Sequence, residues 1–301
     1  MDYPAKIILF GEYGIILNSK ALAIPFPRFS GRLKVTQSSD LKLSKKALES
    51  NAALSELNNY FKNYNEKFKF LDLIRFNEDV NQGLYFDSSI PSGSGLGSSG
   101  ALTAALYDKY CTVNHLNDLQ VIKNKLADIE SCFHGISSGT DPFISWIQKP
   151  VLLENDSSPN ASIDLSPFLK NYTLFLINSH AIGNTGALVN LFMKNYQQPD
   201  YKEKIDHHYL PIINQTIEAV LAADFSTFES SISKYSQFQL NYLGQMISPD
   251  MVNFFKHGNE SGDFYLKICG SGGGGFILGI SSQPEKAEAY FNLNHLDYLI
   301  V

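Results

Sequence analysis

Cysteine is scarce in this sequence, and its placement excludes two common kinds of stabilisation. The three cysteines, Cys111, Cys132 and Cys269, are far apart, and no C-x-x-C pair occurs. An odd and dispersed set is typical neither of a disulfide framework nor of a structural zinc site. Free thiols are usual in a reducing compartment. We therefore expect a cytoplasmic protein that folds around a hydrophobic core.

Long apolar runs are missing as well. No stretch of about 18 apolar residues occurs in the chain, so the sequence predicts no transmembrane helix and no membrane partner. Asp2 lies where a signal peptide would carry positive charge, and Glu12 interrupts the apolar segment that follows. We therefore expect no secretory leader.

An excess of positive charge is also absent. With 24 Lys and Arg against 30 Asp and Glu, the formal net charge is −6. This balance argues against non-specific binding to nucleic acid or anionic membranes, although a local positive site could still hold a small anion. The 301 residues are 44% hydrophobic, an ordinary globular composition with enough length for two domains.

Hydrophobic periodicity and turn residues divide the chain into strands and helices. The polar segment 155–167 predicts a boundary, and we expect domains at residues 1–160 and 161–301. The expected strands are 6–10, 15–17, 31–38, 84–90, 172–179, 264–269, 276–280 and 296–301. The expected helices are 44–61, 116–133, 205–223, 227–244 and 285–291. The first helix should bury a stripe formed by Ala47, Leu48, Leu54, Leu57 and Phe61.

The segment Ser92–Gly100 contains four glycines and four serines in nine residues, directly before a run of strong helix formers. A helix N-terminus presents unpaired backbone N–H groups and a partial positive charge, and glycines let the backbone approach an anion closely. Ser98 and Ser99 are natural N-cap residues. The pattern predicts a phosphate-binding loop; a glycine-rich turn followed by an N-cap is the alternative.

Two widespread nucleotide motifs fit this segment poorly. Residues 95–100 match G-x-G-x-x-G, but residues 270–275 match it too, so the match is weak evidence for a dinucleotide fold. A Walker A loop ends in Gly-Lys-Ser/Thr, and no lysine stands at that place here. A dinucleotide-binding oxidoreductase is an alternative that rests on the G-x-G-x-x-G match alone.

Four motifs, in order along the chain, resemble those of one kinase family. Residues 4–12 match P-x-K-x-x-L-x-G-E, and residues 91–99 match Pro-x3-Gly-Leu-Gly-Ser-Ser. Residues 138–141 match Ser-Gly-x-Asp, and residues 267–275 match a C-terminal glycine motif. Over nearly its whole length the chain resembles the GHMP small-molecule kinases, the family of galactokinase, homoserine kinase and mevalonate kinase. The segments 184–189 and 240–251 look like the mevalonate-kinase branch.

This resemblance implies a two-domain α+β fold, with an N-terminal α/β domain like ribosomal protein S5 and a C-terminal ferredoxin-like α+β domain. It also implies ATP and Mg²⁺, with the ion held by Ser99 and Glu130, because magnesium prefers hard oxygen ligands. The residues implied to bind the nucleotide are Ser88, Gly93, Ser94, Gly95, Leu96, Gly97, Ser98 and Ser99.

The same resemblance implies which residues act on an alcohol acceptor. Asp141 matches the family's catalytic aspartate, which orients or deprotonates the acceptor hydroxyl, and Lys6 would polarise that hydroxyl and the γ-phosphate. The residues expected to contact the acceptor are Glu12, Tyr13, Gly139, Thr185, Gly272 and Gly273. The expected partner is a small-molecule alcohol, and the sequence leaves room for a homodimer.

Departures from the mevalonate-kinase branch bear on the acceptor. Tyr13 replaces the branch's histidine, and Gly183 and Gly186 stand where the branch often has arginine. A carboxylate without a charged donor loses a hydrogen bond worth about 1.5–3 kcal/mol, so we expect mevalonate to be a poor substrate and a neutral or differently anchored alcohol to be preferred. Arginine introduced at Gly183 is expected to improve mevalonate use. The alternatives are a kinase for a sugar or amino-acid alcohol and a catalytically silent relative that binds a ligand.

Overall fold

The computed structural model describes residues 1–36, 44–113, 118–135, 137–154 and 157–301. Contacts divide the chain into two compact units, and neither is a continuous stretch of sequence. Unit 1 comprises Met1–Lys6, Pro25–Pro91 and Gly97–Lys149. Unit 2 comprises Ile7–Ile24, Ser92–Leu96 and Pro150–Val301. A domain boundary at residue 160 stays a prediction.

One four-stranded sheet is built around a long strand. Its strands are β1 (Tyr3–Phe10), β2 (Ala21–Val35), β3 (Leu84–Ser88) and β4 (Val151–Leu153), in the order β1-β2-β3, with β4 also paired to β2. The start of β2 pairs with β4 from Ala21 to Ala23, and its end pairs with β3 from Gly31 to Val35. Pro25 and Pro27 lie between these two stretches, where their missing N–H groups cost no bond to β4 or to β3.

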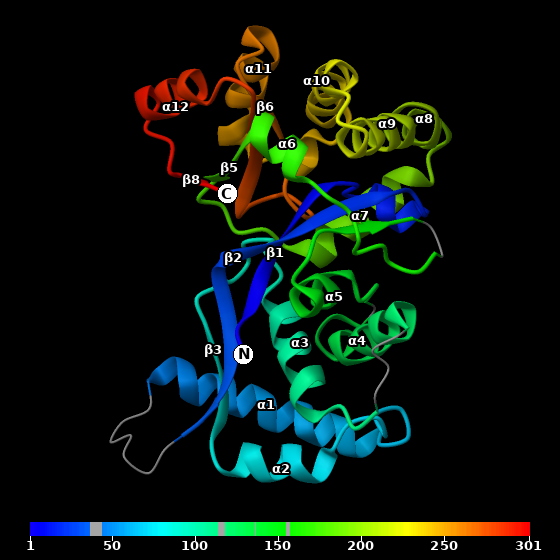
Figure 1. Cartoon of the computed structure of the whole chain (residues 1–301), viewed down its shortest axis with the longest axis vertical. Coiled ribbons are helices and arrows are strands. Elements are labelled where there is room, and N and C mark those ends of the chain that lie inside the picture. Colours follow the sequence, from blue (N-terminus) through cyan, green and yellow to red (C-terminus); the bar gives the residue numbers. More distant parts are fainter. Residues whose placement is uncertain (37–43, 114–117, 136, 155–156) are drawn as a thin grey trace. The chain divides into compact units, whose positions relative to one another are not determined.

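The helices of unit 1 are α1 (Lys45–Asn63), α2 (Leu73–Asn81), α3 (Ser98–Tyr110), α4 (Leu119–His134) and α5 (Thr140–Ile147). Helix α1 begins after Ser44, whose side chain accepts from Ala47 N, and it packs on β3. Most residues of α3 are buried, and it packs against both α4 and α5 (Figure 1). Helix α3 therefore forms the centre of unit 1.

The buried stripe expected on α1 is confirmed at four positions and wrong at one. Ala47, Leu54, Leu57 and Phe61 are buried, whereas Leu48 is 55% exposed. Successive residues of a helix are about 100° apart, so Leu48 turns away from the stripe that begins at Ala47.

The second sheet lies in unit 2 and has the strand order β6-β7-β5-β8. Its strands, all paired antiparallel, are β5 (Thr173–Asn178), β6 (Tyr265–Ile268), β7 (Phe276–Ser281) and β8 (Tyr298–Ile300). The helices of unit 2 are α6 (Ser166–Asn171), α7 (Thr185–Tyr196), α8 (Pro199–Lys204), α9 (Leu210–Leu221), α10 (Phe225–Tyr242), α11 (Val252–Ser261) and α12 (Pro284–Leu293). Helix α10 packs against α9, α11 and β6 (Figure 1).

Short helical turns complete unit 2, and one of them replaces an expected strand. These turns are η1 (Gly14–Leu17), a π-helical segment η2 (Ile205–Tyr209), η3 (Gly244–Met246) and η4 (Pro249–Met251). The strand expected at 15–17 is therefore wrong. Its flanking residues Tyr13 and Asn18 have φ values of 61° and 60°, which turn the chain away from an extended path. The expected segments at residues 37–38, 116–117 and 155–156 lie outside the described residues.

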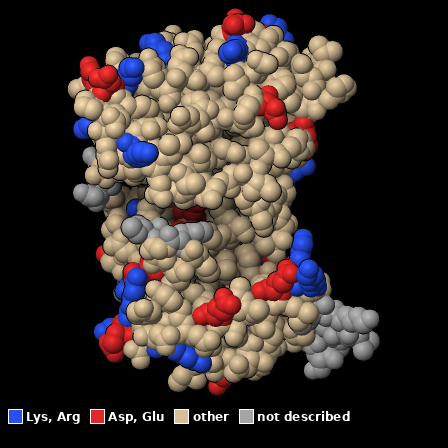
Figure 2. All heavy atoms as spheres, turned by 180° about the vertical axis from the view of Figure 1, so that it is seen from behind, with Lys and Arg blue, Asp and Glu red and all other residues tan. Residues whose placement is uncertain are grey.

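Charged side chains are spread over the face of the molecule drawn in Figure 2. On the face drawn in Figure 2, Lys and Arg lie among Asp and Glu, and the described residues form no broad patch of one sign. Within the described part of the chain, no helix combines the length and the apolar character that crossing a membrane requires.

Candidate active site

The sequence-predicted residues fall into two groups, one in each unit. Unit 1 holds Lys6, Ser88, Gly97, Ser98, Ser99, Glu130, Gly139 and Asp141. Unit 2 holds Glu12, Tyr13, Gly93, Ser94, Gly95, Leu96, Thr185, Gly272 and Gly273. Within each unit, these residues come from elements that are far apart in the sequence.

The N-terminus of α3 carries the serines of the predicted phosphate loop. Gly97 is the N-cap, with φ 77° and ψ 45°, and Ser98 and Ser99 are the first helical residues. The prediction that a serine caps the helix is therefore wrong, because the left-handed backbone at this position favours glycine. Because the N-cap is a glycine, no N-cap side chain accepts from the backbone N–H groups of the first turn. An anion bound at a helix start accepts from these N–H groups.

Lys6 of β1 and Asp141 of α5 form an ion pair, with 3.0 Å between Nζ and Oδ2. The lysine side chain is 4% exposed and the aspartate side chain 31%, so the carboxylate is the more open of the two groups. A Cβ on Gly97 would lie 3.0 Å from Cγ of Lys6 and 3.4 Å from Oδ2 of Asp141. The glycine at the start of α3 therefore lets the ion pair lie directly beside it.

Two further glycines fix the position of Asp141 in the first turn of α5. Gly139 caps α5 with φ 70°, and a Cβ there would lie 3.0 Å from the backbone nitrogen of Ala127 in α4. A Cβ on Gly100 would lie 2.9 Å from the carbonyl carbon of Asp141. These close approaches of α3, α4 and α5 bring Asp141 to Lys6.

Glu130 of α4 is buried and faces two serine hydroxyls. Ser99 Oγ donates to its Oε1 at 3.4 Å, and Ser137 Oγ donates to its Oε2. Burial, with a further contribution from the negative charge of Asp141, raises the pKa of the Glu130 carboxyl to about 7, while the hydrogen bond from Ser137 and the charge of Lys6 oppose the rise. Two carboxylates thus repel each other beside the start of α3, and a bound cation would relieve that repulsion.

These donors fit a magnesium ion. Ser99 Oγ and the Glu130 carboxylate are hard oxygen ligands, and Mg²⁺ usually takes only one or two ligands from protein and the rest from phosphates and water. The described residues contain no group of three or more His, Cys, Asp and Glu able to hold a metal ion. A cation at Glu130 would therefore depend on phosphate oxygens for most of its coordination.

Ser137 is a residue of this site that the sequence reasoning missed. Its Oγ donates to Glu130 and accepts from Gly139 N at 2.9 Å, so one hydroxyl links the carboxylate to the loop before Asp141. The serine pair before a glycine is visible in the sequence. The partner seven residues upstream, on α4, becomes apparent only when the chain folds back.

In unit 2, the segment 92–96 lies against the loop 270–275. Phe276 N donates to Ser94 O at 3.4 Å, and a Cβ on Gly275 would lie 2.7 Å from Cα of Ser94. Only a residue without a side chain allows this approach. The two glycine-rich segments, about 180 residues apart in the sequence, therefore meet through their backbones.

The chain before α7 meets the same loop. Ser271 Oγ donates to Thr185 Oγ1 at 3.1 Å. A Cβ on Gly183 would lie 2.8 Å from the carbonyl oxygen of Gly272, so the structure excludes the arginine expected to be tolerated there. A Cβ on Gly186 would meet its nearest neighbour at 3.8 Å, an ordinary contact. The structure therefore leaves space for a Cβ at 186 but not at 183.

Tyr13 and Glu12 are both buried. The Tyr13 hydroxyl donates to Ser271 O at 2.5 Å. The Glu12 carboxylate forms an ion pair with Lys267 and accepts from Tyr235 OH at 2.8 Å. Burial raises the pKa of the Glu12 carboxyl, and the charge of Lys267 opposes the rise. A direct contact between Glu12 and an acceptor stays a prediction.

Other predicted nucleotide residues differ in exposure. Ser88 is exposed at the end of β3, and its Oγ accepts from Ile90 N at 3.1 Å. Leu96 is fully buried, so only its backbone could face a ligand. The nucleotide roles of both residues stay predictions.

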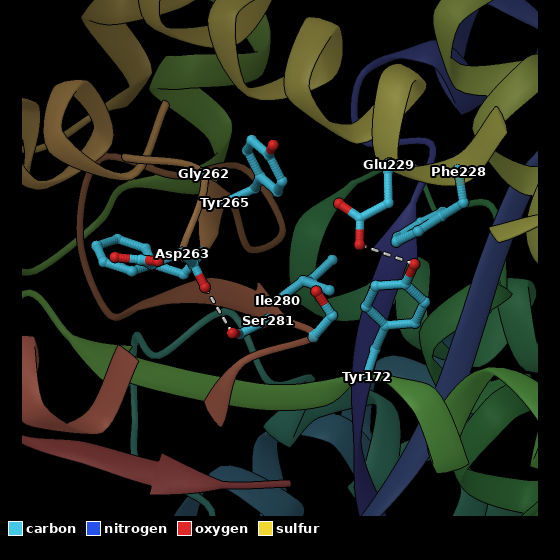
Figure 3. Close-up of a pocket in the computed structure, with 10 residues that line it drawn as sticks. Tyr172, Phe228, Glu229, Gly262, Asp263, Tyr265, Ile280 and Ser281 are labelled. Carbon is cyan, nitrogen blue, oxygen red and sulfur yellow. Dashed lines mark hydrogen bonds between the residues drawn. The ribbon is translucent and has the colours of Figure 1, made fainter. Parts of the chain in front are cut away.

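A separate hollow in unit 2 is not part of the predicted site. Its volume, including the part that is open to solvent, is about 180 Å³. It is lined by residues such as Tyr172, Glu229 and Asp263, and Tyr172 OH donates to Glu229 Oε1 at 3.0 Å (Figure 3). None of the sequence-predicted residues lines it.

Comparison with known families agrees with the geometry of unit 1. Residues 51–148 match the family model described as GHMP kinases N terminal domain. The matched range includes the start of α3, Glu130 and Asp141. This part of the chain is therefore similar to the N-terminal domain of the GHMP kinases.

The chain is similar to named mevalonate kinases over nearly its whole length. It is 25% identical over 311 residues to the mevalonate kinase of Thermococcus sibiricus, covering 95% of this chain and 90% of that protein. It is 23% identical over 319 residues to the mevalonate kinase of Methanocaldococcus jannaschii, covering 100% and 97%. The crystal structure of the Methanococcus jannaschii mevalonate kinase matches with a TM-score of 0.67 at 20% identity, covering 100% of this chain and 96% of that one. The two-domain α+β fold expected from the sequence is thereby confirmed.

Proposed function

We propose that this protein is a GHMP kinase that transfers the γ-phosphate of ATP to an alcohol group of a small metabolite, as a mevalonate-kinase-like phosphotransferase. The observation that carries the proposal is the Lys6–Asp141 ion pair of 3.0 Å beside the glycine N-cap of α3. A partly exposed carboxylate, a buried cation and a helix start suited to an anion are the groups that phosphoryl transfer needs.

In the proposed reaction, Asp141 accepts a hydrogen bond from the acceptor hydroxyl and takes its proton as the oxygen attacks the γ-phosphorus of ATP. The bond between that phosphorus and the β–γ bridging oxygen breaks, and ADP leaves. Lys6 holds Asp141 in place and offsets negative charge on the transferring group. The first turn of α3 orients the phosphates through its backbone N–H groups. Phosphoryl transfer depends mainly on such positioning and charge stabilisation, so little further chemistry is required of the protein.

Ser99 and Glu130 are proposed to hold the magnesium ion. When bound, the ion would neutralise phosphate charge. The protein's own contribution is to keep the Glu130 carboxylate oriented, through its hydrogen bonds from Ser99 and Ser137. Ligation also requires the unprotonated carboxylate.

The acceptor is proposed to be an alcohol that needs no arginine for anchoring. The mevalonate kinases similar to this chain make mevalonate the first compound to test. Gly183 and Gly186 offer no charged side chain, which favours a neutral or differently anchored alcohol. A sugar or amino-acid alcohol is the second candidate, and a catalytically silent ligand-binding protein is the third. The cytoplasmic location stays a prediction.

A coupled assay of ADP release, with mevalonate, phosphomevalonate, homoserine, shikimate and sugars as acceptors, tests the proposal. We expect acceptor-dependent ADP release that requires both ATP and Mg²⁺. Binding of MgATP without turnover on any acceptor would favour the catalytically silent protein. Absence of nucleotide binding would contradict the proposed function.

A further inference from the structure

The Glu12–Lys267 ion pair lies inside unit 2, and no step of the proposed reaction uses it. Both side chains are 0% exposed. Removing two charges from water is costly, and well-packed apolar residues of similar size are often at least as stabilising as a buried pair. Stability alone therefore does not explain why two charges occupy this core position.

The pair is embedded in further hydrogen bonds. Lys267 Nζ donates to the carbonyl oxygens of Ile268 at 2.6 Å and Ile8 at 3.4 Å. The Glu12 carboxylate also accepts from Tyr235 OH at 2.8 Å. Several directional hydrogen bonds therefore hold the two charged groups. Such a network can fix the positions of the chain segments that it joins.

The same network holds the turn that follows β1. Gly11 N donates to Tyr235 OH at 3.1 Å, and Tyr209 OH donates to the carbonyl oxygen of Glu12 at 3.2 Å. The next residue, Tyr13, has φ 61° and ψ −38°, a strained conformation for a bulky side chain. Such strain persists only where surrounding contacts fix it, and it concentrates at functional sites.

The strained turn bears directly on the glycine loop. Tyr13 OH donates to Ser271 O at 2.5 Å, and Ser271 Oγ donates to Thr185 Oγ1 at 3.1 Å. Lys267 lies in β6, the strand that leads into this loop. The ion pair thus joins the residue before Tyr13 to the strand before Ser271, and it fixes both sides of the Tyr13–Ser271 contact.

We propose that Glu12 and Lys267 are positioning residues of this kinase, whose ion pair clamps the turn 11–13 onto the loop 270–275 in its reactive arrangement. The inference rests on the proposed function. In this proposal Glu12 does not contact the acceptor directly. It acts on the acceptor site through Tyr13 and Ser271. The clamp acts on the loop and leaves the α3 nucleotide site of unit 1 unchanged.

The test compares Lys267→Met, Glu12→Gln and the double variant with the wild-type protein. Each single change leaves one buried group without its charged partner, so both should lower Tm. The double variant is neutral and should recover most of that loss. Its kcat/KM for the acceptor should nevertheless stay about 10- to 100-fold below wild type, since a misplaced reacting group has an effect of this order. Its KM for MgATP should stay near the wild-type value.

Lys286→Met is the matched control, because it removes a lysine of unit 2 from an exposed pair with Asp263 at 3.3 Å. It should leave both Tm and kcat/KM near wild type. A double variant that recovers kcat/KM together with Tm would show that the pair is only structural, and would overturn the proposal. If the double variant does not fold, Glu12→Gln alone is tested, because it keeps the shape of the side chain and can still accept from Tyr235. It should lower kcat/KM for the acceptor and leave the KM for MgATP near the wild-type value.

Amide hydrogen exchange separates this inference from the proposed function. If the wild-type protein phosphorylates no acceptor, the proposed function fails, but the clamp can still be measured. We expect residues 11–15 and 270–275 to exchange faster in the double variant, while the strands β5 and β7 keep their protection. Unchanged protection of both segments would overturn the clamp.

Discussion

Asp141 and Lys6 differ sharply in exposure although they form one ion pair, and this difference assigns their roles. Asp141→Asn keeps the shape of the side chain and removes the negative charge that would accept the hydroxyl proton. We expect kcat to fall by about 10²- to 10⁴-fold, the usual effect of losing a general base. Calorimetry should show MgATP affinity little changed, since Asp141 is not a proposed ligand of the nucleotide or the ion.

Asp128→Asn is the control for this prediction. Asp128 lies on α4 in the same unit and pairs with Lys67 at 3.2 Å, on the surface. Its replacement should leave kcat unchanged. A near-normal kcat for Asp141→Asn would remove Asp141 from the catalytic role.

Glu130 gives the metal-free protein a specific pH dependence. Burial raises the pKa of its carboxyl to about 7 from an ordinary value of 4.5, so the folded state binds a proton more tightly than the unfolded state does. The resulting stabilisation is complete below about pH 4.5 and is lost as the pH rises through about 7, with a total on the order of 3 kcal/mol. Denaturant unfolding in EDTA at pH 5 and pH 8 measures this loss.

The Glu130→Gln variant serves as the reference, because a glutamine side chain has no carboxyl group that could titrate. The free energy of unfolding should fall more between pH 5 and pH 8 in the wild-type protein than in Glu130→Gln. Equal falls in the two proteins would show that Glu130 does not titrate in this range.

At the scale of elements, the start of α3 depends on the absence of a side chain at Gly97. Alanine there would need a left-handed backbone and would bring its Cβ to 3.0 Å from Cγ of the buried Lys6. We expect Gly97→Ala to lower stability by about 1–2 kcal/mol from backbone strain alone, with a further loss from the contact. Nucleotide binding should weaken because the ion pair and the helix start shift apart.

Gly135→Ala separates the two effects. Gly135 has φ 81°, and a Cβ there would meet nothing within 4 Å, so only the strain remains. It should lower the unfolding free energy without weakening nucleotide binding. Equal binding losses in both variants would contradict a specific role for Gly97.

Local sequence patterns predicted the main elements and motifs. The long-range contacts could not be predicted from these patterns. The Ser-Gly-x-Asp segment leads into α5, a helix that the sequence did not predict. The dense glycine-serine loop 92–100 leads into helix α3, as expected. The cap itself was mispredicted, because serine preference at an N-cap is a local average that the left-handed backbone at Gly97 overrides. Lys267 was missed as a partner of Glu12 because 255 residues separate them and neither has a local signature of pairing.

At the scale of the whole molecule, the distribution of arginine limits which acceptors can be anchored. The only arginines of the sequence are Arg28, Arg32 and Arg75, so none occurs after residue 75. Lysines occur after residue 75, but some lysines already form ion pairs within the protein. Lys20 pairs with Glu154 and Glu218, and Lys267 pairs with Glu12. A carboxylate acceptor would therefore lack the planar bidentate donor that binds such groups best.

Gly186→Arg should for this reason improve the use of mevalonate. The position lies in the first turn of α7 and has room for a side chain, whereas Gly183 is closed by the carbonyl oxygen of Gly272. A charge-assisted hydrogen bond worth about 1.5–3 kcal/mol corresponds to a rise of roughly 10- to 150-fold in kcat/KM if it is fully expressed in the transition state. Gly186→Gln, which is neutral, should give little of this gain, and neither variant should change the KM for MgATP. Efficient turnover of mevalonate by the wild-type protein would contradict the account, because a cation other than arginine would then have to hold the carboxylate, and replacing Lys20 and Lys194 in turn would identify it.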